Sequence, residues 1–200
     1  MNGIWKATLE SFRDSVASAE PAPAGVSVSA VSATLGISLL QKVLEIVAKR
    51  KSFAGDFGRL ESLRQAARNE SERLTRYANE DIAAYRAYME ARRLKTADET
   101  ARALRDVNET PLKAARSALS GLDLCADAAG IVTGAIAADL GTAAILLAGA
   151  IRALLLSVDA NLQQQPDRET SVERREIEEK ALRQLDSVLR QVTILAGSAG

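Results

Sequence analysis

Histidine is absent from this 200-residue chain, and cysteine occurs once, as Cys125. Without histidine, the usual zinc ligand sets are unavailable, and Ser-His-Asp and Cys-His nucleophiles are excluded. A single cysteine cannot build a disulfide framework, and its place in an apolar stretch indicates inert packing. We therefore expect no metal site and no tightly bound cofactor. Any catalysis must use carboxylates, lysines, arginines, hydroxyls or backbone groups.

Aromatic residues are also scarce, at 4% of the chain, whereas alanine and leucine dominate the apolar positions. Small apolar side chains let helices approach closely, and no segment shows the alternation that is typical of a strand. With 47% hydrophobic and 26% charged residues, the composition is that of a folded soluble protein. The sequence therefore predicts an all-α fold, a single-domain antiparallel helical bundle of about six to seven helices over residues 1–200.

Neither sign of charge is in excess, because Lys and Arg together number 26 and Asp and Glu together also number 26. Such a chain has no overall positive field to hold nucleic acid or an anionic membrane, so neither is an expected partner. The most apolar stretch is divided by Asp139 and Arg152, which leave 12 uncharged residues between them, short of the ~20 that span a membrane. The first residues lack the pattern of a signal peptide, so a cytoplasmic location is expected.

Apolar residues at helical spacing divide the first half of the chain into helices. A first amphipathic helix is predicted from Ile4 to Val16, and a Pro/Gly turn at residues 20–27 ends it. From Val26 to about Arg50 the chain is apolar or small on nearly every side, which predicts a buried central helix. A long amphipathic helix is predicted from Phe53 to about Arg93.

Two helix starts are expected in the second half of the chain. The polar segment 95–107 predicts a loop with a short helix, and Thr110-Pro111 then resembles a start signal, with threonine as N-cap. A buried helix follows over the apolar stretch 131–158. Residues 163–169 form a polar break, and Thr170 to Glu173 match a capping box that opens the last helix.

The turn at residues 20–27 is the first candidate binding site. Pro23 and Gly25 lead the chain into the start of a helix, where unpaired N–H groups and a partial positive charge suit an anion. Ser27 adds a hydroxyl at this start. The alternative is an ordinary interhelical turn in which Ser27 only caps the helix.

Asp81 is the second candidate, because it falls on the apolar stripe of its helix, four residues from both Tyr77 and Tyr85. A carboxylate in that position needs a partner or acquires a raised pKa, which prepares it for proton transfer. The alternative is an aspartate paired with an arginine across the bundle.

Further charges stand in or beside apolar segments. Asp139 and Arg152 lie in the most apolar stretch, where a charge is costly unless it is paired, so they indicate either a site or an ion pair between helices or subunits. Lys51 closes the cluster Lys49-Arg50-Lys51 at the end of a helix. Cations there complement the helix dipole, and they would also attract a polyglutamate tail.

The order of these features resembles the cyclodeaminase/cyclohydrolase family, which includes the cyclodeaminase half of formiminotransferase-cyclodeaminase and bacterial methenyltetrahydrofolate cyclohydrolases. The resemblance runs from about Leu9 to Asn161. The segments that carry it are Phe12 with Ala17–Pro23, Lys49–Phe53, Glu80–Met89, Thr110–Leu112, and Asp139–Gly141 with Arg152 and Asn161.

The resemblance implies an all-α homodimer or higher homo-oligomer with a site near the subunit interface and a tetrahydrofolate derivative as substrate. The reaction would be hydrolysis of the 5,10-methenyl form to 10-formyl-tetrahydrofolate, or closure of the 5-formimino form with loss of ammonia. Either reaction involves a cationic one-carbon bridge, which a carboxylate stabilises. The expected catalytic residues are Asp81 and Asp139, and the expected substrate-binding residues are Pro23, Gly25, Ser27, Lys51 and Arg152.

Two segments depart from the family pattern. Ala24-Gly25-Val26 stands in place of a triple glycine, and side chains at two of those positions would obstruct close approach of a ligand to the backbone. The polar approach to the late aspartate is replaced by the largely apolar Thr133–Ala138. The alternative function is therefore that of a catalytically inactive member, acting as a folate-binding or helical protein-interaction module.

Overall fold

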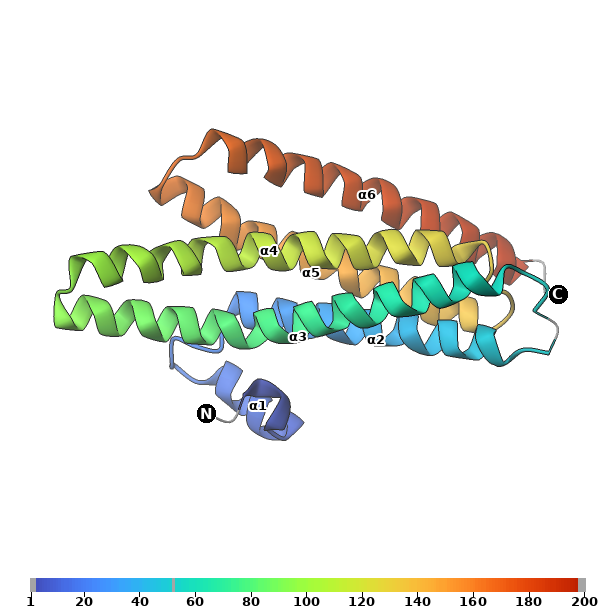
Figure 1. Ribbon diagram of the computed structural model, residues 1–200, viewed down its shortest axis with the longest axis horizontal. Coiled ribbons are helices and arrows are strands. Elements are labelled where there is room, and N and C mark those ends of the chain that lie inside the picture. Colours follow the sequence, from blue (N-terminus) through green and yellow to red (C-terminus); the bar gives the residue numbers. More distant parts are fainter. Residues whose placement is uncertain (1–2, 52, 198–200) are drawn as a thin grey trace.

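The computed structural model describes residues 3–51 and 53–197, and within these ranges it contains helices and no strand (Figure 1). The predicted all-α fold is therefore confirmed. A 3-10 turn, η1 (Ile4–Lys6), precedes six α-helices in this part of the chain: α1 (Leu9–Ala17), α2 (Gly25–Lys49), α3 (Phe57–Leu94), α4 (Ala97–Ala129), α5 (Ile136–Gln164) and α6 (Arg168–Gly197).

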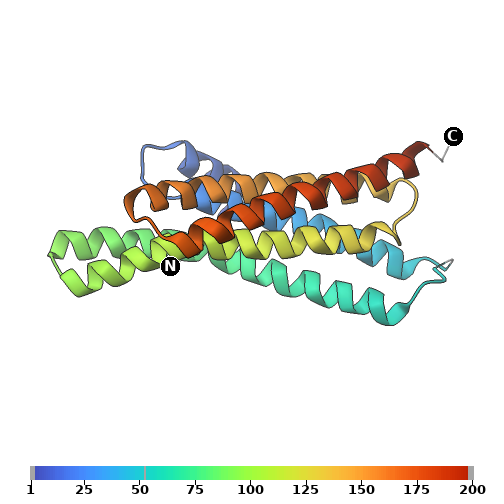
Figure 2. The ribbon, with the colours of Figure 1, turned by 90° about the horizontal axis from the view of Figure 1, so that it is seen from above.

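The four helices α2 to α5 run alternately up and down and form an antiparallel bundle (Figures 1 and 2). Each packs against the next along the chain, α5 closes against α2, and α6 covers α4 and α5. Alanine and leucine fill the core, including the fully buried Leu40, Leu122, Leu147 and Leu154. The short α1 stands apart from the bundle and has no buried residue.

Two glycines allow α2, α4 and α5 to approach one another closely. A Cβ atom on Gly36 would come within 3.1 Å of Leu147 Cγ and 3.2 Å of the carbonyl oxygen of Ala143. A Cβ atom on Gly121 would lie 3.0 Å from Ile37 Cδ1. Small residues at these positions therefore set the distance between the core helices.

The predicted start of the fourth helix at Thr110-Pro111 is wrong. α4 begins at Ala97, two residues after Lys95, whose φ of 58° ends α3, and Pro111 lies inside the helix. The preceding residues, such as Ala103, are buried on the same stripe, and helix-favouring Ala, Arg and Leu outweigh the ~3 kcal/mol that one internal proline costs. The Thr110 hydroxyl donates to the carbonyl oxygen of Asp106 at 2.7 Å instead of capping a helix.

The ends of the other helices also differ from the sequence prediction. α6 begins at Arg168, and its cap is the Asp167 carboxylate, which accepts a bond of 2.7 Å from the backbone N–H of Thr170. Asp167 is as good a cap as threonine and comes earlier, so the helix gains a turn and the polar break shrinks to residues 165–167. The predicted first helix is divided into η1 and α1, since the Thr8 hydroxyl accepts from the N–H of Ser11 and starts α1.

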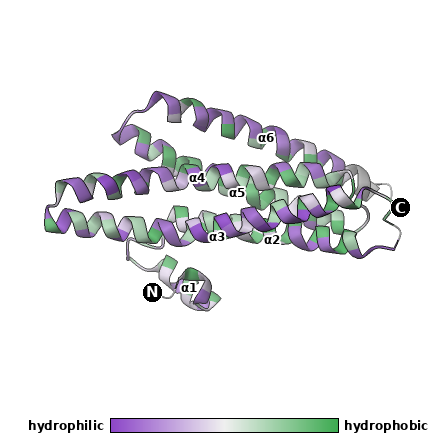
Figure 3. Ribbon diagram, in the orientation of Figure 1, coloured by the Kyte–Doolittle hydropathy of each residue, from purple (hydrophilic) through white to green (hydrophobic). Residues whose placement is uncertain are grey.

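The two most apolar helices, α2 and α5, are long and apolar enough to cross a membrane by length and composition alone. They pack against each other, and 50% of the apolar window of α2 and 56% of that of α5 are buried in the bundle. Polar residues concentrate on α3, α4 and α6 (Figure 3). The outer sides of α2 and α5 remain apolar and uncovered in a single copy, with Leu35 54%, Ile145 52% and Leu156 69% exposed.

Candidate functional site

A cavity of about 250 Å³ lies where the start of α2 meets the second half of α3, the first half of α4 and the last turns of α5. The turn before α2 forms its rim. The lining residues are Pro21, Ala22, Ala24, Gly25, Val26, Asp81, Tyr85, Val107, Pro111, Ser157, Ala160 and Asn161. Asp81 is the one charged residue in this set.

Asp81 accepts a hydrogen bond from the hydroxyl of Ser27, which is fully buried at the start of α2. Burial raises the pKa of the Asp81 carboxyl above its ordinary value, while hydrogen bonds from the Ser27 hydroxyl and backbone act in the opposite direction. Asp81 forms no ion pair with any residue that the structure describes. The alternative of an arginine partner across the bundle is therefore not realised, and the carboxyl keeps an oxygen for a ligand.

The first turn of α2 supplies backbone donors to the same cavity. Ala24 is the N-cap and offers no side-chain hydrogen bond, and the first helical bond runs from the N–H of Val28 to the Ala24 carbonyl at 3.0 Å. The N–H groups of Gly25 and Val26 therefore have no partner within the helix. Ser27 lies inside the helix, so its predicted alternative role as a cap is wrong.

Pro111 was not recognised from the sequence as a site residue. It has no N–H to donate to the carbonyl of Val107, four residues earlier, and both residues line the cavity. That carbonyl is therefore a hydrogen-bond acceptor without its regular helical partner. The detectable signal was a proline that lies between two groups of helix-favouring residues, Ala103 to Arg105 before it and Leu112 to Ala115 after it. Asn161 adds an amide side chain that makes no hydrogen bond to another residue in the described ranges.

The structure brings together only part of the predicted site. Gly25, Ser27 and Asp81 meet at the cavity, whereas Pro23 lines an adjacent hollow beneath α1. Asp139 pairs with Lys42 at 2.8 Å near the surface. Because Lys42 follows Ser27 by 15 residues, about 22 Å of helix α2 separates this pair from the cavity of the same chain.

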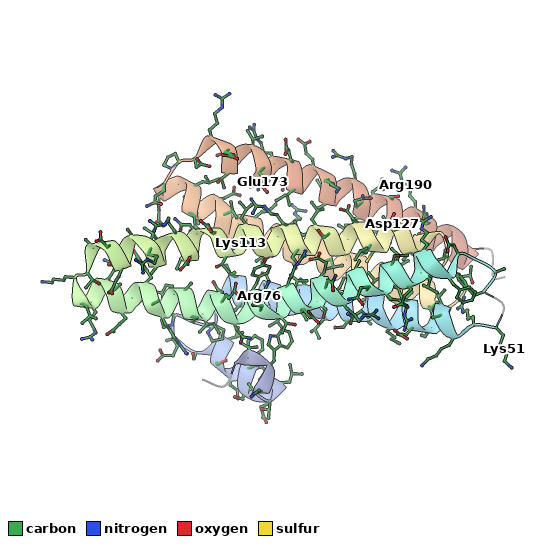
Figure 4. All side chains as sticks on the ribbon, viewed as in Figure 1. Lys51, Arg76, Lys113, Asp127, Glu173 and Arg190 are labelled. Carbon is green, nitrogen blue, oxygen red and sulfur yellow. The ribbon has the colours of Figure 1, made fainter. Side chains whose placement is uncertain are left out.

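Lys51 and Arg152 also lie away from the cavity. Lys51 is exposed at the far end of the bundle (Figure 4), and Ser52 beside it lies outside the described residues. At this end Arg50, which follows α2, contacts the connection between α4 and α5. It donates to the Thr133 hydroxyl at 2.7 Å and to the Thr133 carbonyl at 2.9 Å. Arg152 is exposed on the outer side of α5, and it forms no ion pair within the described ranges.

Asp159, which shares the helix with Arg152, binds Arg174 of α6 through two bonds of 2.8 and 2.9 Å. No group of three or more Cys, Asp or Glu side chains in the described part of the chain is placed to hold a metal ion. The cavity therefore offers one carboxyl of raised pKa, backbone donors, a free carbonyl and an amide. These groups suit proton transfer on, and hydrogen bonding to, a small polar ligand.

Comparison with known proteins gives matches along nearly the whole chain. Methenyltetrahydrofolate cyclohydrolase of Methylorubrum extorquens is 26% identical over 197 residues, which are 94% of this chain and 91% of that protein. The crystal structure of formiminotetrahydrofolate cyclodeaminase from Thermotoga maritima superposes with a TM-score of 0.82 at 22% identity, covering 98% of this chain and 100% of that one. The family model of formiminotransferase-cyclodeaminase matches residues 8–180, and the chain therefore belongs to this family.

Proposed function

We propose that this protein is a cytoplasmic enzyme that hydrolyses 5,10-methenyltetrahydrofolate to 10-formyltetrahydrofolate. The observation that carries the proposal is a cavity in which the one charged lining residue is Asp81, because the methenyl bridge of the substrate is a cation. The similarity to the Methylorubrum extorquens cyclohydrolase supports the choice of reaction. The tetrahydrofolate derivative is a substrate here and not a resident cofactor.

In the proposed reaction, water attacks the carbon that bridges N5 and N10 of the substrate. Asp81 stabilises the cation, takes a proton from the attacking water and returns a proton to N5 as the N5–carbon bond breaks. The formyl group stays on N10, and one proton is released overall. The Ser27 hydroxyl fixes the orientation of the Asp81 carboxyl. The Val107 carbonyl and the Asn161 amide would bind the N–H and carbonyl groups of the reduced pterin ring.

The related cyclodeaminase reaction is the first alternative, since closure of 5-formimino-tetrahydrofolate with loss of ammonia produces the same cationic bridge. The second alternative is an inactive folate-binding member, which the replaced glycines suggested. Space around the turn argues against inactivity, because a Cβ atom added at Gly25 would meet no atom within 4 Å. Ala24 and Val26 line the cavity without closing it.

The cavity also suggests how the substrate is oriented. A second hollow, of about 510 Å³, continues along α3 and shares Pro21, Ala22 and Tyr85 with the first. Arg86 and Arg93 line it, and Arg93 is paired with Glu90 at 2.6 Å whereas Arg86 forms no ion pair in the described ranges. We place the pterin ring at Asp81, the aminobenzoyl ring against Tyr85 and the glutamate carboxylates near Arg86.

The apolar outer sides of α2 and α5 support the proposal of a homodimer. Exposed large apolar residues on both helices form one surface, and a second copy of the chain would remove it from water. This apolar surface also explains the sequence prediction for α2. The helix was predicted to be buried because it is apolar on nearly every side, although one side of it is exposed to solvent in a single copy.

The experiment that tests the proposed reaction follows the ultraviolet absorbance of methenyltetrahydrofolate with purified protein. We expect consumption above the buffer rate. A parallel assay with 5-formimino-tetrahydrofolate measures formation of the methenyl form, and turnover in this assay alone would assign the cyclodeaminase reaction instead. If neither substrate is turned over, calorimetric titration with folates separates an inactive binder from a protein with no folate function.

A further inference from the structure

The wall of the cavity that α5 supplies has two polar side chains, Ser157 and Asn161. Residues four apart lie on the same side of a helix, about 6 Å from each other along its axis, so both side chains face the cavity from one wall. Ser157 is half-buried. Asn161 has a role in the proposed reaction as a group that binds the pterin ring, whereas Ser157 has none.

The Ser157 hydroxyl has no partner among the residues that the structure describes. Serine and threonine hydroxyls inside these helices commonly donate to the carbonyl oxygen four residues earlier, as Thr34 of α2 does at 2.8 Å and Thr142 of α5 at 3.0 Å. The Ser27 hydroxyl instead binds the carboxyl of Asp81. Ser157 forms neither kind of bond in the described ranges, so its hydroxyl is available to a molecule in the cavity.

The register between α2 and α5 places Ser157 near the carboxyl that Ser27 binds. Lys42 pairs with Asp139 at 2.8 Å, and the two helices run antiparallel (Figure 1). Ser27 lies 15 residues before Lys42, so it is level along the bundle with Leu154, which lies 15 residues after Asp139. Ser157 is about one helical turn beyond that level, or about 4.5 Å along the axis. The two hydroxyls therefore face the same part of the cavity.

We propose that the Ser157 hydroxyl binds the water molecule that attacks the one-carbon bridge, an inference that rests on the hydrolysis proposed above. A water molecule that gives one proton to Asp81 has a second O–H bond, and the Ser157 oxygen can accept a hydrogen bond from it. With both O–H bonds held by the protein, a lone pair of the water oxygen is directed at the carbon between N5 and N10.

This role accounts for both protons of the water. The water oxygen forms a bond to the bridging carbon while one proton passes to Asp81 and then to N5 as the N5–carbon bond breaks. The second O–H group, which contacts Ser157, loses its proton to solvent when the formyl C=O bond forms. Ser157 accepts a hydrogen bond throughout and takes no proton. Closure of the formimino form expels ammonia and uses no attacking water, so a water-binding hydroxyl in the cavity favours hydrolysis over that reaction.

Two variants of nearly equal shape isolate the hydroxyl. Ser157→Thr keeps a hydroxyl, whereas Ser157→Val has a methyl group in its place. With methenyltetrahydrofolate in the absorbance assay, we expect Ser157→Val to lower kcat about three- to tenfold with KM unchanged, as for loss of one hydrogen bond between neutral groups. Ser157→Thr should keep kcat within about twofold of the wild type, because the hydrogen bond remains.

A matched variant and a pH profile separate this role from a structural one. Ser187 of α6 is also a half-buried serine whose hydroxyl has no partner in the described ranges, and it lies outside the cavity, so Ser187→Val should change neither kcat nor KM. Ser157 forms no hydrogen bond to Asp81. The acid limb of the pH–rate profile should therefore stay in place in Ser157→Val.

Four outcomes would overturn the proposal while the proposed hydrolysis stands. They are an unchanged kcat in Ser157→Val, equal losses of kcat in the valine and threonine variants, a rise in KM alone, and a shifted acid limb. The first would show that the hydroxyl is not needed, and the other three would show that the residue acts through its shape, through substrate binding or through Asp81. Absence of hydrolysis by the wild type would overturn the proposed function itself, and this inference with it.

Discussion

Asp81 of α3 accepts a hydrogen bond from Ser27 of α2, although the two residues are 54 positions apart in the sequence. The bond joins a fully buried hydroxyl to the one charged residue of the cavity. It fixes a carboxyl with a raised pKa beside the free backbone donors at the start of α2. This relationship is the basis of the first two predictions.

Asp81→Asn should lower kcat by about 10²- to 10⁴-fold, the range that a general acid–base group contributes. It should not lower stability, because the folded state raises the pKa of Asp81 above the ordinary 3.8. The protonated carboxyl therefore favours folding, and this contribution to the free energy of unfolding is lost as pH rises from 3.8 through the folded pKa. An amide does not ionise, so the Asp81→Asn variant would not suffer this loss at neutral pH. Absorbance assays and urea unfolding at neutral pH measure the two effects. Glu80→Gln, on the same helix and exposed, is the control that should change neither.

Ser27→Ala should move the acid limb of the pH–rate profile to higher pH. The Ser27 hydroxyl lowers the pKa of Asp81 against the effect of burial, so its removal leaves the Ser27 backbone as the remaining opposing hydrogen bond and raises that pKa further. A base of higher pKa becomes ionised only at higher pH. Profiles of kcat/KM from wild type and variant give the shift, and an unchanged or acid-shifted limb would show that Asp81 is not the titrating base.

The fold was predictable from the sequence because helical periodicity and small apolar side chains act locally. The boundaries of α2 were predicted within one residue at each end, since the Pro/Gly turn and the cluster at Lys49 are local signals. Part of the candidate site was predictable for a similar reason, because Asp81 is an acidic residue on an apolar stripe and Ser27 follows a turn. Their mutual contact was not predictable from either segment alone.

The rest of the site depends on which helices become neighbours. Asp139 was grouped with Asp81 because the family resemblance implies two catalytic carboxylates, but α5 runs antiparallel to α2 and carries Asp139 to the opposite end. Pro111 was interpreted as a helix start because proline is common there, whereas residues of α4 upstream of it gain enough buried contact to continue the helix. Tertiary packing decided both cases.

Pro111→Ala should stabilise the protein and impair substrate binding. Alanine restores the N–H that can donate to the Val107 carbonyl, and proline is ~3 kcal/mol less favourable than alanine inside a helix. Because the surrounding helix already accommodates proline, we expect the free energy of unfolding to rise by about 1–3 kcal/mol. KM should rise as the free carbonyl is lost from the cavity. Pro166→Ala, in the connection between α5 and α6, should show neither effect.

Arg86→Gln should raise KM for a triglutamate form of methenyltetrahydrofolate by roughly two- to fivefold and leave kcat unchanged, as expected for one exposed charge pair. The effect should be smaller with the monoglutamate and should fade at high salt. Arg105→Gln is the matched variant, because Arg105 lines a different hollow that meets the cavity at Asn161. A larger rise in KM for this second variant would reverse the proposed orientation of the substrate.

Ile145→Arg should convert the proposed homodimer to a monomer, because it places a charge within the exposed apolar surface of α2 and α5. Leu182→Arg is the matched control on α6. Both side chains are about half exposed in a single copy, at 52% and 49%, so neither variant removes core packing. Light scattering after size-exclusion chromatography gives the mass of each. Equal masses for the two variants would mean that this surface of α5 does not hold the copies together.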